Sequence, residues 1–386
     1  MDIKSKLSDI ENYLLSLFPV RNKIVFLNFW GRGYGDSPKY IAEEIIRQNL
    51  PYEMVWLVHD MNSEMPDRIK KVKYYSFKSR IELATARVII SNVKGGLQFR
   101  KKKTQYYIQT WHGGFGVKFI EKEIENSLTA KYVRSSKHDS SITDLILSGS
   151  EFQTKVIKDA FWYDGEIFKK GVPRNDIFFG VTKEKVALLK QKYGFQNTDK
   201  VVLYAPTFRD DNSSDAYQLD PTMLLGALVE RTGFQWKLII RLHPIAVSHR
   251  SLFHYDESVI DGSGFPDSQE LLVMSDLLIT DFSSVMMDFA IMRKPVFLFI
   301  TDLEQYIQRC RDIRPIFYQL PFALAHSNDE LCNAICEYDE LEYQKDLKIF
   351  MDDNFQSYDD GHASEYVVDR IKSVINNRMS YKEKVI

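Results

Sequence analysis

The fold class is indicated most clearly by residues 23–49, KIVFLNFWGRGYGDSPKYIAEEIIRQN. An apolar run comes first, a glycine-rich polar segment follows, and a helical pattern ends the stretch. A nearly continuous run of Val, Ile, Leu and Phe predicts a strand buried on both faces, as in a parallel sheet covered by helices. Ser37-Pro38 predicts a helix start, with serine as the cap and proline at the first helical position. The stretch is therefore typical of one strand–helix step in an α/β domain.

The same alternation recurs along the chain in two sets. Further strands are predicted at residues 53–60, 86–92, 106–111 and 144–150, and then at 200–207, 236–244, 276–284 and 294–300. A charged helical pattern over residues 183–199, ending near Gly194, separates the sets. With 386 residues the chain exceeds the roughly 250–300 at which a single core stops growing. We therefore predict two doubly wound, Rossmann-like domains facing a cleft, residues 1–180 and residues 181–386.

Composition excludes several classes of protein. Lys and Arg total 51 against 53 Asp and Glu, so the net charge of -2 argues against a nucleic-acid binder. The three cysteines, Cys310, Cys332 and Cys336, are odd in number and form no paired framework, which predicts reduced thiols in a cytoplasmic protein. The first residues lack the apolar core of a signal peptide. No apolar run approaches the ~18 residues of a membrane span.

Polar residues at the predicted strand ends are the candidates for a site, because ligands of open α/β sheets bind beyond the carboxyl ends of the strands. The relevant segments are QTWHGGFGVK (109–118), YAPTFRDD (204–211), IIRLHP (239–244) and TDFSSVMMD (280–288). They are rich in hydroxyls, arginines, histidines and glycines and contain no carboxylate cluster for a metal, a mixture that suits a phosphate or diphosphate. Ser283-Ser284 precedes a predicted helix, whose free N–H groups could bind phosphate or simply be capped. Arg241 and His243 follow a predicted strand, where they could point charge into the cleft or satisfy the loop.

His112 stands between a predicted strand and two glycines, Gly113 and Gly114. Glycines permit a close approach of the backbone to a ligand, or a tight turn. An imidazole with a pKa near ~6.5 is suited to accept a proton at neutral pH. The residues alone leave a catalytic and a structural role for His112 open.

In their order, the motifs resemble one family. TWHGGFGVK, GVPRND, YAPTFRD, RLHP and TDFSSVMMDF…KPVFLF look like those of the CDP-glycerol glycerophosphotransferases of teichoic acid and capsule synthesis. GRGYGDSPKYI, LATARVIISN and DGHASEYVVDRI also fit, so the resemblance extends from about residue 20 to residue 375. It implies a glycosyltransferase-B type fold with the acceptor in the first domain and the nucleotide donor in the second.

The resemblance also implies the site. His112 would act as the catalytic base, His243 would stabilise the phosphate, and the Ser283-Ser284 pair would hold the diphosphate. The donor-binding residues that it implies are Trp111, His112, Gly113, Gly114, Arg174, Pro206, Thr207, Arg241, His243, Ser283, Ser284 and Asp288. The sequence departs from the family pattern where Gly114-Phe115 replaces Thr-Pro and where Pro315 follows Arg314 in place of glycine. These departures leave glycerol or ribitol in the donor, and the identity of the acceptor, open.

The implied activity is transfer of an alditol phosphate from a CDP-alditol to a hydroxyl of a lipid-linked or polymeric glycerol-phosphate acceptor, with release of CMP. No metal ligands are recognised, although Mg²⁺ could accompany the diphosphate. Two alternatives stay open: a UDP-sugar-dependent glycosyltransferase or epimerase of the same fold, and a non-catalytic protein that binds an anionic polymer.

Near the N-terminus, apolar residues recur at helical spacing, at positions 7, 10, 14 and 17. This stripe predicts either peripheral attachment to a membrane surface or packing on protein.

Overall fold

The computed structural model describes residues 13–97, 100–243 and 245–383, which form two compact units. The first unit comprises the chain up to His112, residues 121–176 and the chain from Tyr358 onward. The second comprises residues 113–120 and 177–357. Each unit contains one parallel sheet between helices, so the predicted α/β fold with two Rossmann-like domains is confirmed.

The first sheet has the strand order β3-β2-β1-β4-β5-β6-β7, and all of its pairs are parallel. The order reverses between β1 and β4, which makes their carboxyl ends the expected place for a ligand. The strands are β1 Lys23–Leu27, β2 Glu53–Val58, β3 Ile69–Lys73, β4 Val88–Ser91, β5 Tyr106–Gln109, β6 Leu145–Ser148 and β7 Glu166–Lys169.

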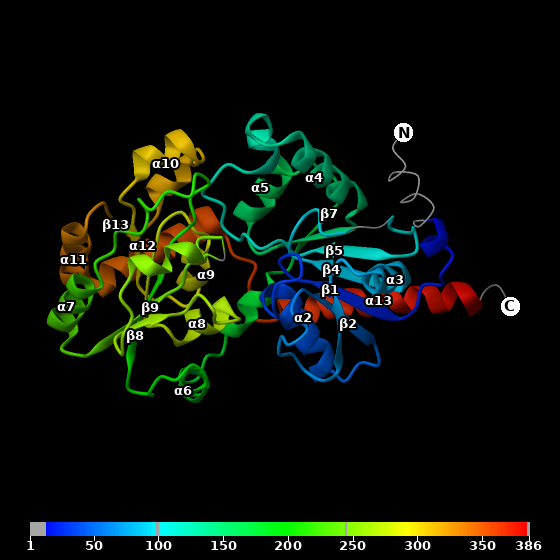
Figure 1. Cartoon of the computed structure of the whole chain (residues 1–386), viewed down its shortest axis with the longest axis horizontal. Coiled ribbons are helices and arrows are strands. Elements are labelled where there is room, and N and C mark those ends of the chain that lie inside the picture. The colour runs from blue at the N-terminus through cyan, green and yellow to red at the C-terminus, as the bar shows by residue number, and fades with distance from the viewer. Residues whose placement is uncertain (1–12, 98–99, 244, 384–386) are drawn as a thin grey trace. The chain divides into compact units, whose positions relative to one another are not determined.

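Side chains that alternate along β1 fill two separate cores of this unit. Ile24 and Phe26 belong to a core shared with helices α2 (Asp36–Arg47) and α13 (Ala363–Glu383), whereas Val25 and Leu27 belong to a core shared with α3 (Phe77–Thr85). Figure 1 shows α13, in red, beside α2. The remaining helical segments are η1 Glu121–Ser127, α4 Ala130–Ile142, α5 Glu151–Ala160 and η2 Pro173–Phe178, which ends in the second unit.

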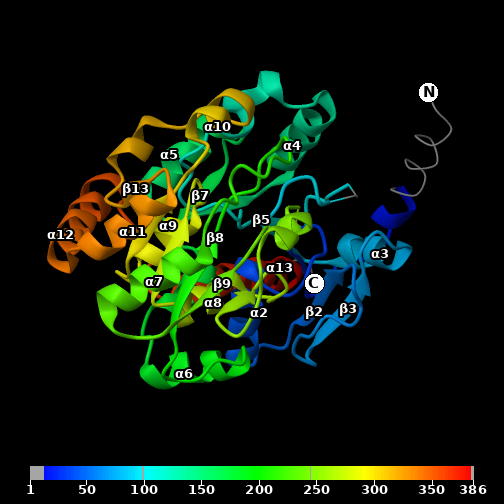
Figure 2. The same cartoon turned by 60° about the vertical axis from the view of Figure 1, so that its left-hand side comes forward.

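The second sheet has the order β10-β9-β8-β11-β12-β13, again entirely parallel, and its order reverses between β8 and β11. Its strands are β8 Lys200–Ala205, β9 Trp236–Ile240, β10 Val259–Asp261, β11 Leu277–Thr280, β12 Val296–Phe299 and β13 Ala323–Ala325. Its helical segments are α6 Lys183–Lys192, α7 Pro221–Thr232, η3 Val247–Leu252, α8 Ser268–Met274, α9 Val285–Ala290, α10 Leu303–Arg309, η4 Pro315–Gln319, α11 Asn328–Glu337, α12 Glu340–Phe350 and η5 Met351–Phe355. Helices α7 and α11 pack together on one face, side by side in both views (Figures 1 and 2).

The start of helix α2 differs from the prediction. Ser37 was expected to cap the helix, but the helix begins at Asp36 and its cap position is Gly35. The Ser37 side chain is buried, and its hydroxyl has no hydrogen-bond partner among the described residues. The Asp36 carboxylate instead accepts a hydrogen bond from the Ser37 backbone N–H. A local pattern identified the helix but assigned its cap to the wrong side chain.

The compact units change near the expected division, between Asp176 and Ile177 rather than after residue 180, and two further segments are assigned differently. The chain from Tyr358 onward returns to the first unit, where the Asp359 carboxylate accepts hydrogen bonds from Val172 N and Asn175 Nδ2. Residues 113–120 are counted with the second unit. Both segments are placed by contacts with residues far away in the sequence, which no local pattern encodes.

The predicted apolar stripe near the N-terminus is described only in part. Residues 7 and 10 lie outside the described residues, while Leu14 and Leu17 are more than half exposed and the intervening Leu15 is buried. Membrane attachment through this stripe therefore stays a prediction. Within the described ranges, no helix has the length and apolar character needed to cross a bilayer.

We expect the first unit to depend on α13 for its stability. Ile371 is fully buried in the core between α13 and the first sheet, so Ile371→Ala should lower the free energy of unfolding of that unit by ~2–5 kcal/mol. Four of the five tryptophans lie in the first unit, so urea unfolding followed by fluorescence in a Trp236→Phe background reports on that unit alone. Leu17→Ala, at an exposed position of the same unit, is the matched control. Equal small losses in both variants would contradict the assignment of α13 to this core.

Candidate active site

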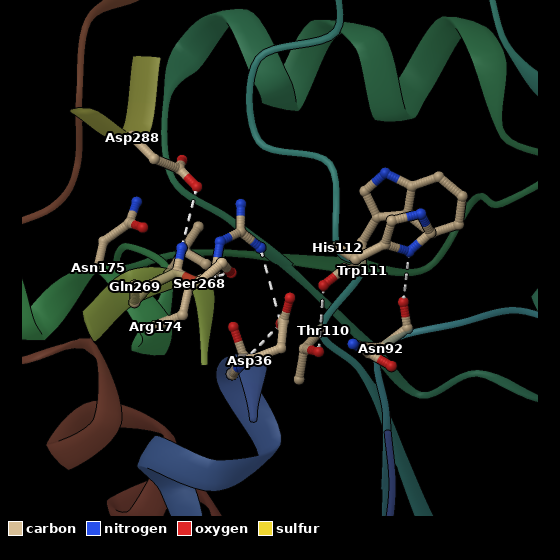
Figure 3. A network of polar contacts seen from close by, with 12 residues as sticks. Asp36, Asn92, Thr110, Trp111, His112, Arg174, Asn175, Ser268, Gln269 and Asp288 are labelled. Carbon is tan, nitrogen blue, oxygen red and sulfur yellow. Dashed lines mark hydrogen bonds and ion pairs between the residues drawn. The ribbon is translucent and has the colours of Figure 1, made fainter. Parts of the chain in front are cut away.

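His112 lies beyond the carboxyl end of β5 and is held by main-chain and ring contacts. Its Nδ1 is 2.8 Å from the backbone carbonyl oxygen of Asn92 (Figure 3). The rings of Phe29 and Trp111 pack against the imidazole, with centroid distances of 5.3 and 4.5 Å. Because a carbonyl oxygen can only accept a hydrogen bond, Nδ1 carries the proton. In the neutral ring Nε2 therefore keeps its lone pair and can accept a proton.

The Asn92 carbonyl is itself held by a pair of buried amide side chains. Asn92 Nδ2 donates to Asn28 Oδ1 at 2.8 Å, and Asn92 Oδ1 accepts from Phe29 N at 2.8 Å. Asn28 Nδ2 donates to the Arg32 carbonyl at 2.9 Å. Asn28 follows β1 and Asn92 follows β4, the two strands at which the order of the sheet reverses. The orientation of His112 is therefore set by the loops at the expected ligand-binding edge.

Trp111, and not a glycine, has the unusual backbone at this site. Its φ is 54°, in the left-handed region, whereas Gly113 and Gly114 are not among the residues with positive φ. Gln109 Oε1 accepts a hydrogen bond from Trp111 N at 2.9 Å, and Gln109 Nε2 donates to the Val93 carbonyl at 3.1 Å. A left-handed backbone conformation is strained for a residue with a bulky side chain. Such strain persists where surrounding contacts hold the residue in place, often at functional sites.

Arg174 is buried in the first unit next to an acidic side chain. Its Nη1 lies 3.7 Å from Asp36 Oδ1, and Asp36 also has a left-handed backbone, with φ of 55° (Figure 3). The neighbouring Asn175 donates to Asp359, while Asn175 Oδ1 is buried without a partner among the described residues. The predicted phosphate ligand Arg174 is thus already partly neutralised within its own unit.

The pKa of His112 is lowered from its ordinary value. Burial disfavours the charged imidazolium and is the largest cause, and the nearby Arg174 acts in the same direction. The Asn92 carbonyl and the charge of Asp36 oppose this shift. His112 is therefore neutral at physiological pH, which is the form that a general base requires.

In the second unit, a buried ionic cluster joins the ends of β8, β11 and β12. The Arg209 guanidinium lies between two carboxylates, with Nη1 2.9 Å from Asp281 Oδ2 and with Nε and Nη2 2.6 and 2.8 Å from the Asp302 oxygens. Asp281 Oδ1 also accepts from Thr207 N at 2.8 Å. Thr207 follows Pro206 at the end of β8, and its buried hydroxyl has no hydrogen-bond partner among the described residues. A buried polar atom without a hydrogen bond lowers the stability of the fold unless a ligand or a water molecule forms a hydrogen bond with it.

His243 carries its proton on the opposite nitrogen from His112. The backbone N–H of Ile245 donates to His243 Nδ1 at 3.2 Å, and the Phe208 ring lies 4.6 Å from the imidazole between centroids. Because an N–H can only donate, Nδ1 is the acceptor and Nε2 carries the proton in the neutral ring. The Nε2–H group of His243 can therefore donate a hydrogen bond to an anion even at neutral charge.

The other predicted donor ligands of the second unit have varied surroundings. Ser284 occupies the cap position of α9, but its side chain makes no capping hydrogen bond, and Ser283 Oγ accepts from Val285 N at 3.4 Å. Arg241 Nη1 donates to the carbonyls of Gly262 and Phe265 at 3.0 and 2.7 Å, so this nitrogen holds a neighbouring loop. The Asp288 carboxylate accepts from Gln269 Nε2 at 3.2 Å (Figure 3).

The sequence reasoning missed the residues that hold these side chains in place: Asn28, Asp36, Asn92, Arg209, Asp281 and Asp302. Ligands of such sheets bind at the carboxyl ends of the strands, and this rule could have identified two of these residues. Asn92 directly follows β4, and Asp281 directly follows β11. Within the described part of the chain, no group of three or more His, Cys, Asp or Glu side chains is arranged to hold a metal ion.

Comparison with known proteins identifies related sequences over nearly the whole chain. A family model described as CDP-Glycerol:Poly(glycerophosphate) glycerophosphotransferase matches residues 12–373. A teichoic acid poly(glycerol phosphate) polymerase of Staphylococcus epidermidis is 31% identical over 374 residues, covering 92% of this chain and 51% of that protein. The polymerase of Bacillus subtilis is 30% identical, with 93% of this chain and 50% of that protein covered. The chain thus spans about half the length of these two relatives.

Other relatives are matched over most of their length. A teichoic acid glycerol-phosphate transferase of Staphylococcus aureus is 27% identical, with 93% of this chain and 95% of that protein covered. Among solved structures, the wall teichoic acid polymerase TagF soaked with CDPG has a TM-score of 0.85 at 30% identity, covering 98% of this chain and 97% of that one. A UDP-N-acetylglucosamine 2-epimerase from Listeria monocytogenes has a TM-score of 0.50 at 12% identity, which shows similarity of fold alone.

Titration should reveal the lowered pKa of His112. In a histidine-labelled protein, the His112 resonance, assigned by its loss in His112→Gln, should titrate below the ordinary value of about 6.5. Between the folded and unfolded pKa values the unfolded chain binds more protons, so the stability of the wild type relative to His112→Gln should fall as the pH drops from about 7 to about 5. A His112 resonance that titrates at or above 6.5 would contradict the description of a partly buried, neutral base.

Proposed function

The chain belongs to the CDP-glycerol:poly(glycerophosphate) glycerophosphotransferase family, and from this we propose that it transfers glycerol phosphate from CDP-glycerol to a hydroxyl of a glycerol-phosphate acceptor. The family match and the relatives, which are teichoic acid polymerases and transferases, support the reaction class. We place the protein in the cytoplasm, with its acceptor presented at the membrane surface. CDP-ribitol is the alternative donor.

The opposite protonation of two histidine rings is the observation that carries the proposal. In the first unit His112 is oriented with Nε2 as the proton acceptor, and in the second His243 is oriented with Nε2 as the donor. Transfer to an alcohol needs a base for the hydroxyl proton and a donor for the charge that develops on phosphoryl oxygens. A protein that only bound an anionic polymer would have no use for a neutral base with a lowered pKa.

In the proposed reaction, the acceptor hydroxyl oxygen forms a bond to the glycerol-bearing phosphorus. The bond from that phosphorus to the bridging oxygen breaks, and CMP leaves with the electron pair. His112 Nε2 takes the hydroxyl proton as the new bond forms. His243 Nε2–H and the hydroxyls of Ser283 and Ser284 donate to the phosphoryl oxygens. Phosphoryl transfer depends mainly on such positioning and charge stabilisation.

In this proposal Arg241 and Arg174 each bind the phosphate with only some of their N–H groups, because the others are engaged within the protein. Arg241 Nη1 is engaged with two carbonyls, so its remaining nitrogens would face the phosphate. Arg174 is paired with Asp36 and lies three residues before the chain enters the second unit at Ile177. We assign it the same phosphate role, with Asp36 holding the guanidinium in place. Trp111 and the two glycines border the base, and Asp288 belongs to the donor side. Mg²⁺ would be brought by the diphosphate itself.

Loss of the base should abolish turnover and leave donor binding intact. We expect His112→Gln to reduce CMP release from CDP-glycerol at least ~10²-fold, because a general base contributes about that much or more. The Kd for CDP-glycerol should change only a few-fold. His138→Gln removes an exposed histidine of the same unit and should retain full activity. Turnover of His112→Gln within a few-fold of the wild type would refute the assignment of His112 as base.

The orphan hydroxyl of Thr207 gives a second test. If it meets the donor, Thr207→Val should raise the Kd for CDP-glycerol by roughly 2- to 10-fold, the value of one hydrogen bond. The melting temperature without ligand should stay the same or rise, because an unpaired buried hydroxyl is replaced by a methyl group of similar shape. Thr222→Val, at an exposed position of α7, is the control.

The rival activity, that of a UDP-sugar-dependent enzyme, is tested by a binding panel of CDP-glycerol, UDP-N-acetylglucosamine and UDP-glucose. Tighter binding of a UDP-sugar than of CDP-glycerol would favour the rival activity.

A further inference from the structure

Lys118 belongs to a segment that is firmly attached to the second unit. The backbone of Lys118 forms an antiparallel bridge with Ile313. On either side of it, Arg314 N donates to the Val117 carbonyl at 2.7 Å and Phe119 N donates to the Asp312 carbonyl at 3.1 Å. These hydrogen bonds fix the main chain that carries the Lys118 side chain.

The same segment leads directly to the carboxyl ends of the central strands β8 and β11. Residues 312–314 continue into η4, where the Phe317 ring lies 5.5 Å from Phe282 between centroids. Phe282 separates Asp281 from Ser283 in the sequence. The charge of Lys118 interacts with Asp281 and Arg209, and also with Arg311 and Asp210. The Lys118 charge is therefore within electrostatic reach of Asp281, which follows β11, and of Arg209, which follows β8.

The acidic side chains around Lys118 already have other partners. Asp281 is paired with Arg209 at 2.9 Å, and Asp210 is paired with Arg311 at 3.1 Å. No hydrogen bond or ion pair joins Lys118 Nζ to any residue that the structure describes. Burial lowers the pKa of Lys118 to about 8, and the carboxylates of Asp281 and Asp210 oppose this shift without cancelling it. Desolvation of an ammonium group costs free energy unless an anion pairs with the group.

We propose that Lys118 is a further residue of the donor site, whose ammonium group binds an oxygen of the donor's diphosphate. This inference rests on the proposed function. Two independent observations indicate the same place: the ammonium group without a hydrogen-bonding partner, and the buried Thr207 hydroxyl that also has none among the described residues. Lysine binds phosphate as a compact point charge, and it needs no bidentate geometry to do so.

A purely structural role for Lys118 predicts a different result. In that case the ammonium would balance the carboxylates of Asp281, Asp302 and Asp210, which are shared by only two arginines, Arg209 and Arg311. Removal of the charge would then lower the stability of the second unit, and any loss of binding would extend to ligands without phosphate.

The test compares Lys118→Met, which keeps the length of the side chain, Lys118→Arg, which keeps the charge, and Lys183→Met, an exposed control in the same unit. We expect Lys118→Met to raise the Kd for CDP-glycerol at least ~10-fold, the cost of a lost hydrogen bond to a charged group. Binding of cytidine, which has no phosphate, should stay unchanged. Lys118→Arg should bind CDP-glycerol within a few-fold of the wild type, and Lys183→Met should equal it.

The outcomes separate this inference from the proposed function. Wild-type protein that binds CDP-glycerol and releases CMP, together with an unchanged Kd in Lys118→Met, would overturn the role of Lys118 alone. A lower melting temperature with equal losses for cytidine and CDP-glycerol would overturn it in favour of charge balance. Wild-type protein that binds no CDP-glycerol would overturn the proposed function and this inference with it. If Lys118→Met does not fold, Lys118→Gln takes its place with the same criteria: a selective loss of CDP-glycerol binding with unchanged cytidine binding supports the inference, and an unchanged Kd or equal losses for both ligands overturn it.

Discussion

Parallel strand pairing is the constraint on which both units depend. Every pair in the two sheets is parallel, so each strand must be followed by a connection that returns to the opposite end of the sheet. The returning helices bury both faces of the sheet, which explains the continuous apolar runs of the central strands. All carboxyl ends then lie at one edge of each sheet. For this reason His112 follows β5 at that edge of the first sheet, and Ser283 follows β11 at that edge of the second.

That edge gathers polar groups in a place partly removed from water, so each group needs a partner. In the first unit the Asn28 and Asn92 amides bond to each other, and in the second unit Arg209 bonds to its two carboxylates; each network fixes the loops of its own unit. Removal of one partner from such a network leaves the others buried and unpaired, which costs more than the bond itself contributes. The exceptions are therefore informative. The Thr207 hydroxyl and the Lys118 ammonium lack hydrogen-bonding partners among the described residues, and both lie at the same strand ends of the second unit.

The sequence predicted the central strands of both sheets and missed the edges. β3, β7, β10 and β13 are the four edge strands, and none was predicted. Their sequences, IKKVK, EIFK, VID and ALA, have no long apolar run because one side of an edge strand faces solvent or a loop. The return of α13 to the first unit was also missed, because its buried residues would suit either domain equally. Only long-range contacts such as Asp359 with Val172 decide between them.

The reacting groups of the candidate site could be predicted from the sequence, but the contacts that hold them in position could not. A motif can indicate His112, but the Asn92 carbonyl that fixes its proton on Nδ1 is a main-chain atom without a sequence signal. The glycines after His112 lie where the chain passes from one compact unit to the other. The chain leaves the first unit between His112 and Gly113, and Phe115 already packs against Phe350 and Phe355 of the second. His112 is held by one unit and Phe115 by the other, so the backbone between them must accommodate both. Neither glycine has a positive φ, so the two residues do not supply a left-handed backbone; what they supply at this crossing is the absence of side chains directly after His112 in the sequence.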